Sequence, residues 1–147
     1  MNYYTNNFLE TKKLGEEIVK KIKPSKRGAT VFCLKGDLGA GKTTFLQGFG
    51  IGLKIKEKIQ SPTFIIMNRH VLKNNNFKNF FHFDCYRLEK PKEIINLGFK
   101  EIIANPDNLV AIEWSSKIQK ILPNQRTEIV FETIDQEKRK ITVKIIK

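Results

Sequence analysis

The chain has 147 residues, 40% of them hydrophobic, which is long enough for one sizeable core and too short for a catalytic domain plus a separate substrate domain. We therefore expect a single domain over residues 1–147. No apolar stretch reaches the length of a membrane span, the first residues lack the basic and apolar regions of a signal peptide, and the two cysteines have no metal or redox spacing. These features favour a cytoplasmic protein with reduced thiols and exclude a membrane partner.

The net charge of +12 has two readings. Basic surfaces attract the phosphates of nucleic acids. However, Lys, Ile, Asn and Phe are all abundant and all encoded by A/T-rich codons, which points to a biased genome, and the lysines are scattered along the chain. An ordinary solvated surface and a weak attraction to an RNA-containing complex are both left open; we expect no DNA partner.

Hydrophobic periodicity predicts alternating helices and strands. Asn7, with Glu10 three residues on, predicts the start of the first helix, and Pro91 predicts the start of a later one, with Ile94, Ile95 and Leu97 turned inward. Residues 73–78 form a polar hairpin tip. The expected helices span residues 8–23, 43–53, 91–97 and 115–122, and the expected strands span residues 29–35, 61–67, 80–84, 109–114, 128–134 and 140–146.

This order of elements predicts an α/β fold. Strands interleaved with helices favour a three-layer domain with a central, mostly parallel sheet and helices on both faces. The last two expected strands alternate around Asp135–Lys138, and we expect them to form an antiparallel hairpin at one edge of the sheet. We find no internal repeat and no linker.

The segment Gly36-Asp-Leu-Gly-Ala-Gly-Lys-Thr-Thr44 matches the phosphate-binding pattern G-x-x-x-x-G-K-[ST] without substitution. A buried strand precedes it and a helix follows it, which is the context that this P-loop requires. Glycines let backbone N–H groups turn around phosphate oxygens, and the helix N-terminus favours negative charge. The residues expected to bind the phosphates of ATP or ADP are Asp37, Leu38, Gly39, Ala40, Gly41, Lys42, Thr43 and Thr44.

The chemistry of a P-loop also needs acids and a metal ion. Lys42 is expected to reach the β and γ phosphates, and the Thr43 hydroxyl to bind Mg²⁺. Asp84 and Glu113 each end an apolar strand, where the sheet topology places side chains beside the loop. One acid is expected on the Mg²⁺ side and the other on the side of the attacking water; spacing alone does not assign them.

Four further residues have two readings each. The Asp37 carboxylate is expected to face away from the phosphates or to accept from loop amides. Thr63 either approaches the metal and the γ phosphate or only forms a turn. His82 is expected to pack in the core or to hydrogen-bond the acid Asp84, two residues on along the same strand face. Trp114 is expected as a core anchor more than as a platform for adenine.

Missing motifs narrow the class of enzyme. The sequence lacks the D-x-x-G and [NT]-K-x-D motifs of GTPases and the arginine-rich lid of small kinases, since its five arginines are widely spread. A slow ATPase completed by a partner fits this pattern best. Two alternatives stay open: a small P-loop kinase of a metabolite, and a binding module that a nucleotide switches without useful hydrolysis.

The chain resembles the TsaE (YjeE) family over nearly its whole length. The resemblance rests on the P-loop and four shorter blocks, which occur in the family's order and spacing: Ser-Pro-Thr-Phe (61–64), His-Phe-Asp-Cys-Tyr-Arg-Leu (82–88), Leu-Gly-Phe (97–99) and Ile-Glu-Trp (112–114). The P-loop alone is common to many proteins, whereas its combination with these blocks is far more specific.

The resemblance implies a bacterial ATPase required for tRNA threonylcarbamoyladenosine formation. Such proteins act with the transferase TsaD and its scaffold TsaB, meet tRNA indirectly through that complex, and hydrolyse ATP weakly alone and better with partners, apparently to reset the transferase. By motif position, Glu113 resembles the family's metal-side acid and Asp84 the acid near the γ phosphate. Lys42 and Thr43 would hold phosphates and Mg²⁺, and Trp114 would serve the partner or nucleotide side.

Three positions depart from the family pattern. Arg69 and His70 stand where the family tends to have Glu-Tyr, which puts in doubt any contact from that strand to a partner or nucleotide. Ser115 replaces the usual proline, and the hairpin tip at 74–76 is long and free of glycine. The last two differences are expected to be surface variation.

Overall fold

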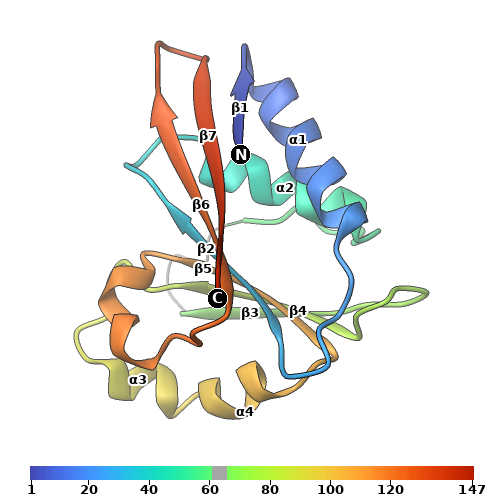
Figure 1. Cartoon of the computed structure of the whole chain (residues 1–147), viewed down its shortest axis with the longest axis vertical. Coiled ribbons are helices and arrows are strands. Elements are labelled where there is room, and N and C mark those ends of the chain that lie inside the picture. Colours follow the sequence, from blue (N-terminus) through green and yellow to red (C-terminus); the bar gives the residue numbers. More distant parts are fainter. Residues whose placement is uncertain (61–65) are drawn as a thin grey trace.

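A seven-stranded mixed sheet forms the centre of the computed structural model, which describes residues 1–60 and 66–147 (Figure 1). The strands are β1 (Asn2–Thr5), β2 (Thr30–Lys35), β3 (Met67–Val71), β4 (Asn79–Asp84), β5 (Asn108–Glu113), β6 (Arg126–Thr133) and β7 (Arg139–Ile146). The helices are α1 (Phe8–Lys21), α2 (Lys42–Gly52), α3 (Pro91–Ile95) and α4 (Phe99–Ala104), and a 3₁₀ helix, η1, spans Ser115–Ile121.

The strand order is β1-β7-β6-β2-β5-β4-β3. The central strands are parallel, since β2 pairs with β5 and β6, and β4 pairs with β5. Antiparallel pairs flank them on both sides. The predicted α/β class is therefore confirmed. The C-terminal hairpin of β6 and β7 also forms, but its predicted place at the sheet edge is wrong, because β1 pairs with the outer side of β7.

The two faces of the sheet carry separate apolar clusters, because side chains of a strand alternate between faces. On β2, Phe32 and Leu34 pack toward α1 and α2, while Val31 and Cys33 pack toward α3, α4 and η1. Figure 1 shows these two groups of helices on opposite sides of the sheet. The side chains of β4 and β5 alternate between the two clusters in the same way. This alternation gives the predicted three-layer arrangement.

Helices α1 and α2 approach each other closely through glycines. A Cβ atom at Gly48 would lie 1.9 Å from the carbonyl oxygen of Lys12, and one at Gly15 would lie 2.1 Å from the carbonyl oxygen of Phe45. Both distances are far below any real contact. The glycines therefore allow α1 to lie against the helix that follows the P-loop.

We expect Gly48→Ala to destabilise the protein, although alanine favours helices by about 1 kcal/mol over glycine. The added methyl forces the two helices apart, and overpacking of this kind costs on the order of 3 kcal/mol. Urea unfolding measures the change, with Ile51→Ala in the same helix as a control, because Ile51 is exposed. A Gly48→Ala variant as stable as the wild type would show that the helices separate at no cost.

Most predicted boundaries hold within a few residues. The Asn7 side chain accepts from the backbone N–H of Glu10 at 2.8 Å, which confirms the expected cap of α1. Leu97, predicted to turn inward, is instead 43% exposed, because α3 ends at Ile95 before that position. Trp114 was expected inside a strand, but β5 ends at Glu113. The expectation that Ser115 is surface variation is wrong, because this residue is buried at the start of η1.

The strand predicted over 61–67 falls mostly on residues 61–65, which lie outside the described residues; a strand begins at Met67. The polar tip between β3 and β4 forms as predicted, and these strands pair in antiparallel fashion. Within the described ranges, no helix combines the length and apolar character needed to span a membrane.

Candidate functional site

The P-loop joins the carboxyl end of β2 to the first turn of α2. Gly36, Gly39 and Gly41 have φ angles of 150°, 78° and 102°, in the region that side chains disfavour. At Gly36 a Cβ would also lie 2.8 Å from the carbonyl oxygen of Phe131. The glycines are therefore needed for the turn itself. The turn leads directly into α2, and the N-terminus of a helix is where an anion is best stabilised.

Arg139 supports the P-loop from behind. This residue begins β7 and is only 3% exposed. Its guanidinium donates to the carbonyl oxygens of Ala40 at 3.1 Å and Gly39 at 3.0 Å. It also donates to the carbonyl oxygens of the β6–β7 turn, at Asp135, Gln136 and Lys138. One buried cation thus ties the P-loop to the hairpin.

We expect Arg139→Met to weaken both folding and nucleotide binding. Methionine fills much of the volume but leaves the loop carbonyls without these donors, and a lost hydrogen bond to a charged group costs about 1.5–3 kcal/mol. Thermal melting with and without Mg·ADP measures both effects. Arg69→Met is the matched control, because Arg69 is exposed and its contacts are with the Asn79 side chain and the Phe81 ring rather than with the P-loop.

Lys42 occupies the first turn of α2 and is largely buried. Its ammonium donates to the carbonyl oxygen of Gly36 and lies 4.3 Å from the centre of the Trp114 ring. Burial lowers the pKa of Lys42 from its ordinary value. The charges of Glu113 and Asp84, and more weakly that of Asp37, act in the opposite direction. The lysine therefore lies within the field of both predicted acids.

Asp84 and Glu113 lie side by side. They are register partners at the ends of the parallel strands β4 and β5, and β5 neighbours β2, which leads into the P-loop. The parallel sheet thus brings together Lys42, Asp84 and Glu113 as the sequence predicted. Their individual roles remain predictions.

Glu113 is held by a histidine. The Nε2 atom of His82 lies 2.7 Å from the carboxylate Oε2 of Glu113, and both side chains are buried. Of the two expectations for His82, packing in the core is confirmed, because its side chain is fully buried. The alternative hydrogen bond to Asp84 is wrong, because the Nε2 atom pairs with Glu113, Nδ1 has no hydrogen-bond partner among the described residues, and the Asp84 carboxylate accepts from the backbone N–H of Tyr86 at 3.0 Å. His82 points to the neighbouring strand, where the register places Ala111 opposite it and Glu113 two residues further.

Asp84 is partly buried, and this burial raises the pKa of its carboxyl above the ordinary value; the charge of Glu113 adds to the effect. The N–H of Tyr86 and the charges of His82 and Lys42 oppose it without cancelling it. The folded protein therefore binds a proton at Asp84 more readily than the unfolded chain does. Its stability falls as pH rises from the ordinary aspartate pKa through the raised one.

We expect Asp84→Asn to be more stable than the wild type at neutral pH, because the amide needs no ionisation in this setting and can still accept from Tyr86. The advantage should vanish near pH 4, close to the ordinary pKa of about 3.9. Urea unfolding of both proteins at the two pH values measures this. Equal stability at pH 7 would contradict the burial cost assigned to the charged carboxylate.

The other residues predicted to bind phosphate lie in the P-loop and in the first turn of α2. Asp37, Leu38 and Gly39 are exposed at the rim of the P-loop, so the Asp37 side chain faces outward, while its carbonyl oxygen accepts from the N–H of Ala40 at 3.1 Å. Thr43 and Thr44 are half-buried in the first turn of α2. Thr63 lies outside the described residues.

Trp114 lies at the junction of core and site. Its backbone is left-handed, with φ of 58°, directly after Glu113. Its ring packs against the apolar cluster on the α3 side, lies 5.0 Å from the Tyr86 ring, and covers the ammonium of Lys42. The expected core contact is present, and the ring also forms one wall beside the P-loop lysine.

Sequence reasoning missed two residues of the site. Arg139 was counted only among the scattered arginines, because no residue near it in the sequence indicates a contact with a loop about 100 positions away. The contact of Tyr86 with Trp114 joins segments 28 residues apart and depends on the end of β4 lying beside the end of β5. That adjacency comes from the strand order rather than from either segment.

The side chains around the P-loop suit a hard divalent cation. Thr43 offers a hydroxyl, and Asp84 and Glu113 offer carboxylates, so the donors are oxygens, as Mg²⁺ requires. In P-loop sites the phosphate oxygens and waters complete the coordination. The residues present therefore fit a Mg·nucleotide.

Comparison with known proteins gives a consistent result. The family model "Threonylcarbamoyl adenosine biosynthesis protein TsaE" matches residues 5–141. The tRNA threonylcarbamoyladenosine biosynthesis protein TsaE of Rickettsia felis is 39% identical, over 91% of this chain and 74% of its own length. Its Bacillus subtilis counterpart is 35% identical, over 97% and 84%. The crystal structure of Bacillus subtilis YdiB superposes with a TM-score of 0.77 at 30% identity, covering 100% of this chain and 86% of that one.

Proposed function

Because this chain belongs to the TsaE family of threonylcarbamoyl adenosine biosynthesis proteins, we propose that it is the Mg²⁺-dependent, ATP-hydrolysing subunit of that tRNA modification system. It acts in the cytoplasm with TsaD and TsaB, hydrolyses ATP weakly alone and faster with these partners, and resets the transferase between turnovers. tRNA reaches it through the complex.

The observation that supports this proposal is the meeting of Lys42, Asp84 and Glu113 at the P-loop. Lys42 would neutralise charge on the β and γ phosphates. Glu113, held by His82, would face the metal with Thr43. Asp84, whose pKa is raised by burial, would orient or deprotonate the attacking water near the γ phosphate. A bound Mg²⁺ would supply charge neutralisation at the phosphate oxygens.

The side chains around the loop also support the proposed slow hydrolysis by the chain alone. Among the described residues, Arg139 is the arginine that hydrogen-bonds the P-loop, and its guanidinium is occupied by carbonyl oxygens of the loop and of the β6–β7 turn. It is therefore not available as an arginine finger, which would stabilise transition-state charge. A partner is expected to complete the site.

Product analysis tests the proposal. ATP incubated with the chain, TsaB and TsaD should give ADP and free phosphate in equal amounts, and phosphate transfer to a metabolite would indicate a kinase instead. Replacing ATP by a non-hydrolysable analogue should block multiple turnovers of tRNA modification. Full activity with the analogue would indicate a nucleotide-switched binding module.

A further inference from the structure

A second pocket lies at the opposite end of the sheet from the P-loop. It has a volume of about 310 Å³ and is called here the distal pocket. It lies between the connection from α1 to β2 and the start of β6. Its lining residues are Lys23, Ser25, Arg27, Gly28, Ala29, Thr30, Val31, Ile103, Pro123, Gln125, Arg126, Thr127 and Ile145.

The charged groups of the distal pocket all have the same sign. Lys23, Arg27 and Arg126 line it, and no carboxylate does. Among the described residues, no carboxylate lies within ion-pair distance of Lys23 or Arg27, whose side chains are exposed. Lys26, exposed between Ser25 and Arg27 on the same connection, is a further cation of this segment but does not line the pocket. The pocket is thus lined by an excess of positive charge.

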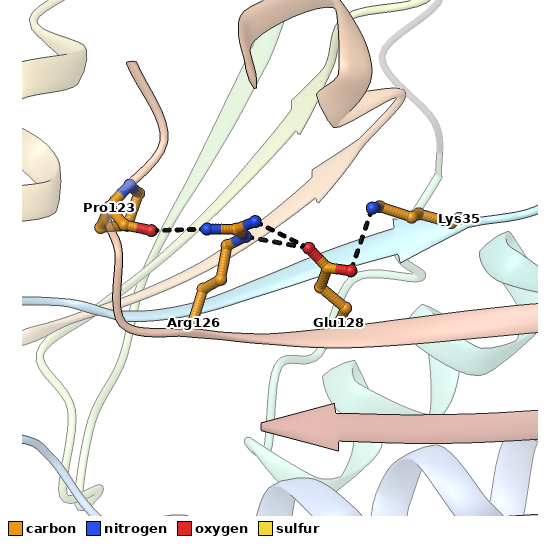
Figure 2. Close-up of polar contacts among 4 residues, drawn as sticks. All are labelled: Lys35, Pro123, Arg126 and Glu128. Carbon is orange, nitrogen blue, oxygen red and sulfur yellow. Dashed lines mark hydrogen bonds and ion pairs between the residues drawn. The ribbon is translucent and has the colours of Figure 1, made fainter. Parts of the chain in front are cut away.

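Arg126 lines the pocket and is fixed in position by the polar contacts that Figure 2 shows. Its NH1 donates to the carbonyl oxygen of Pro123 at 3.0 Å, and its Nε and NH2 bind one carboxylate oxygen of Glu128 at 3.0 and 2.9 Å. The Arg126 side chain is only 12% exposed. Its guanidinium needs no reordering to meet a ligand, and two of its five N–H groups are not used by these bonds.

Glu128 does not neutralise this end of the sheet. Its other carboxylate oxygen binds the ammonium of Lys35 at 3.0 Å, so one carboxylate is shared by two cations (Figure 2). Burial alone would raise the pKa of Glu128, but the hydrogen bonds from Lys35 and Arg126 lower it below the ordinary value, which keeps Glu128 charged. The three groups together still carry one excess positive charge beside Lys23 and Arg27.

We propose that the distal pocket binds a phosphate group of RNA, with Arg126 and Arg27 as the donors to the phosphate and Lys23 at the rim. Arginine forks match phosphate oxygens, and the hydroxyls of Ser25 and Thr127 provide neutral donors nearby. The apolar wall formed by Ile103, Pro123 and Ile145 suits the sugar of the same nucleotide. An RNA chain carries several phosphates and can contact the pocket and Lys26 at the same time. A single free anion cannot do so, and this favours RNA as the ligand.

This site is independent of the proposed ATPase. The pocket includes Thr30, at the start of β2, whereas Lys35, at the end of that strand, leads into the P-loop. Five residue steps of about 3.3 Å place the backbones of Thr30 and Lys35 on the order of 17 Å apart along β2, although the Glu128 carboxylate links the Lys35 side chain to Arg126. Both are therefore open to occupation at once, and the distal pocket gives the chain an RNA contact of its own beyond the one proposed through TsaD and TsaB.

The experiment measures binding of a fluorescent, unmodified tRNA transcript to the full chain by anisotropy over a series of salt concentrations. The test variant is Lys23→Gln/Arg27→Gln, and the matched control is Lys56→Gln/Lys58→Gln, which removes the same charge from exposed positions elsewhere. We expect the test variant to bind several-fold more weakly and its salt slope to fall by about 1 for each lost phosphate contact. The control should keep the wild-type slope.

Three results would overturn the proposal. Equal losses in the test and control variants would show diffuse attraction by net charge, and absence of wild-type binding would remove the RNA contact. Displacement of the transcript by inorganic phosphate or AMP, beyond the effect of chloride at the same ionic strength, would show a site for small free anions. Melting curves and ATP hydrolysis of the test variant should match the wild type, which separates this outcome from failure of the ATPase proposal.

Discussion

Asp84→Asn is expected to lower single-turnover ATP hydrolysis about 10²-fold or more, the scale of a lost general acid–base group. The amide has almost the same shape and still accepts from the N–H of Tyr86, but it cannot take a proton from the attacking water. ADP affinity should stay nearly unchanged, since the carboxylate is proposed to act on the water rather than on the bound phosphates. The measurement pairs single-turnover hydrolysis with ADP affinity, in the presence of TsaB and TsaD so that the site is complete.

Glu113→Gln provides the comparison. This amide keeps a hydrogen-bonding partner for His82 but loses the negative charge proposed to face Mg²⁺. We expect it to weaken Mg²⁺-dependent nucleotide affinity as well as hydrolysis. If the two variants show the opposite pattern, the acids exchange roles. Wild-type hydrolysis by Asp84→Asn would remove Asp84 from the mechanism and leave it as the ordinary end of a buried strand.

Lys42→Ala is expected to abolish most of the thermal stabilisation that a nucleotide gives the wild type. A ligand at about one hundred times its dissociation constant adds roughly 2.7 kcal/mol to the free energy of unfolding. For a domain of this size, each kcal/mol corresponds to roughly 2–4 °C. Mg·ATP or Mg·ADP should therefore raise the wild-type Tm by about 5–10 °C, and differential scanning fluorimetry measures the shift in both proteins.

Two controls accompany this measurement. The Tm of Lys42→Ala without nucleotide reports any direct effect on folding, because the lysine is largely buried and contacts Gly36 and Trp114. GTP should stabilise the wild type much less than ATP, since the sequence has no guanine-reading motif. An unchanged nucleotide shift in Lys42→Ala would refute the P-loop assignment, and equal shifts with GTP and ATP would argue against an ATPase.

Sequence reasoning succeeded where local patterns determine the structure. The P-loop glycines, the Asn7 cap and the alternating pattern of β6 and β7 each depend on neighbouring residues, and each forms as predicted. Asp84 and Glu113 could be placed at strand ends because each follows an apolar run. Their adjacency required the parallel sheet, which the alternation of helices and strands indicated.

The features that sequence reasoning missed depend on tertiary contacts. Strand β1 was missed because four residues carry too little periodicity, and it forms only because β7 offers a free edge. The pairing of His82 with Glu113 depends on the register of β4 and β5, which no local pattern contains. Arg139 lies about 100 positions from the loop that it supports, so its role appears only in the folded chain.

We propose above all that the chain enables repeated turnover of tRNA modification through ATP hydrolysis at the P-loop. The most direct measurement is multiple-turnover formation of threonylcarbamoyladenosine on tRNA by TsaB and TsaD, with no addition, with the wild-type chain, or with Lys42→Ala. We expect modification to continue over many turnovers only with the wild-type chain and ATP, and to stop early in the other two reactions. Equal multiple-turnover rates in all three reactions would contradict it.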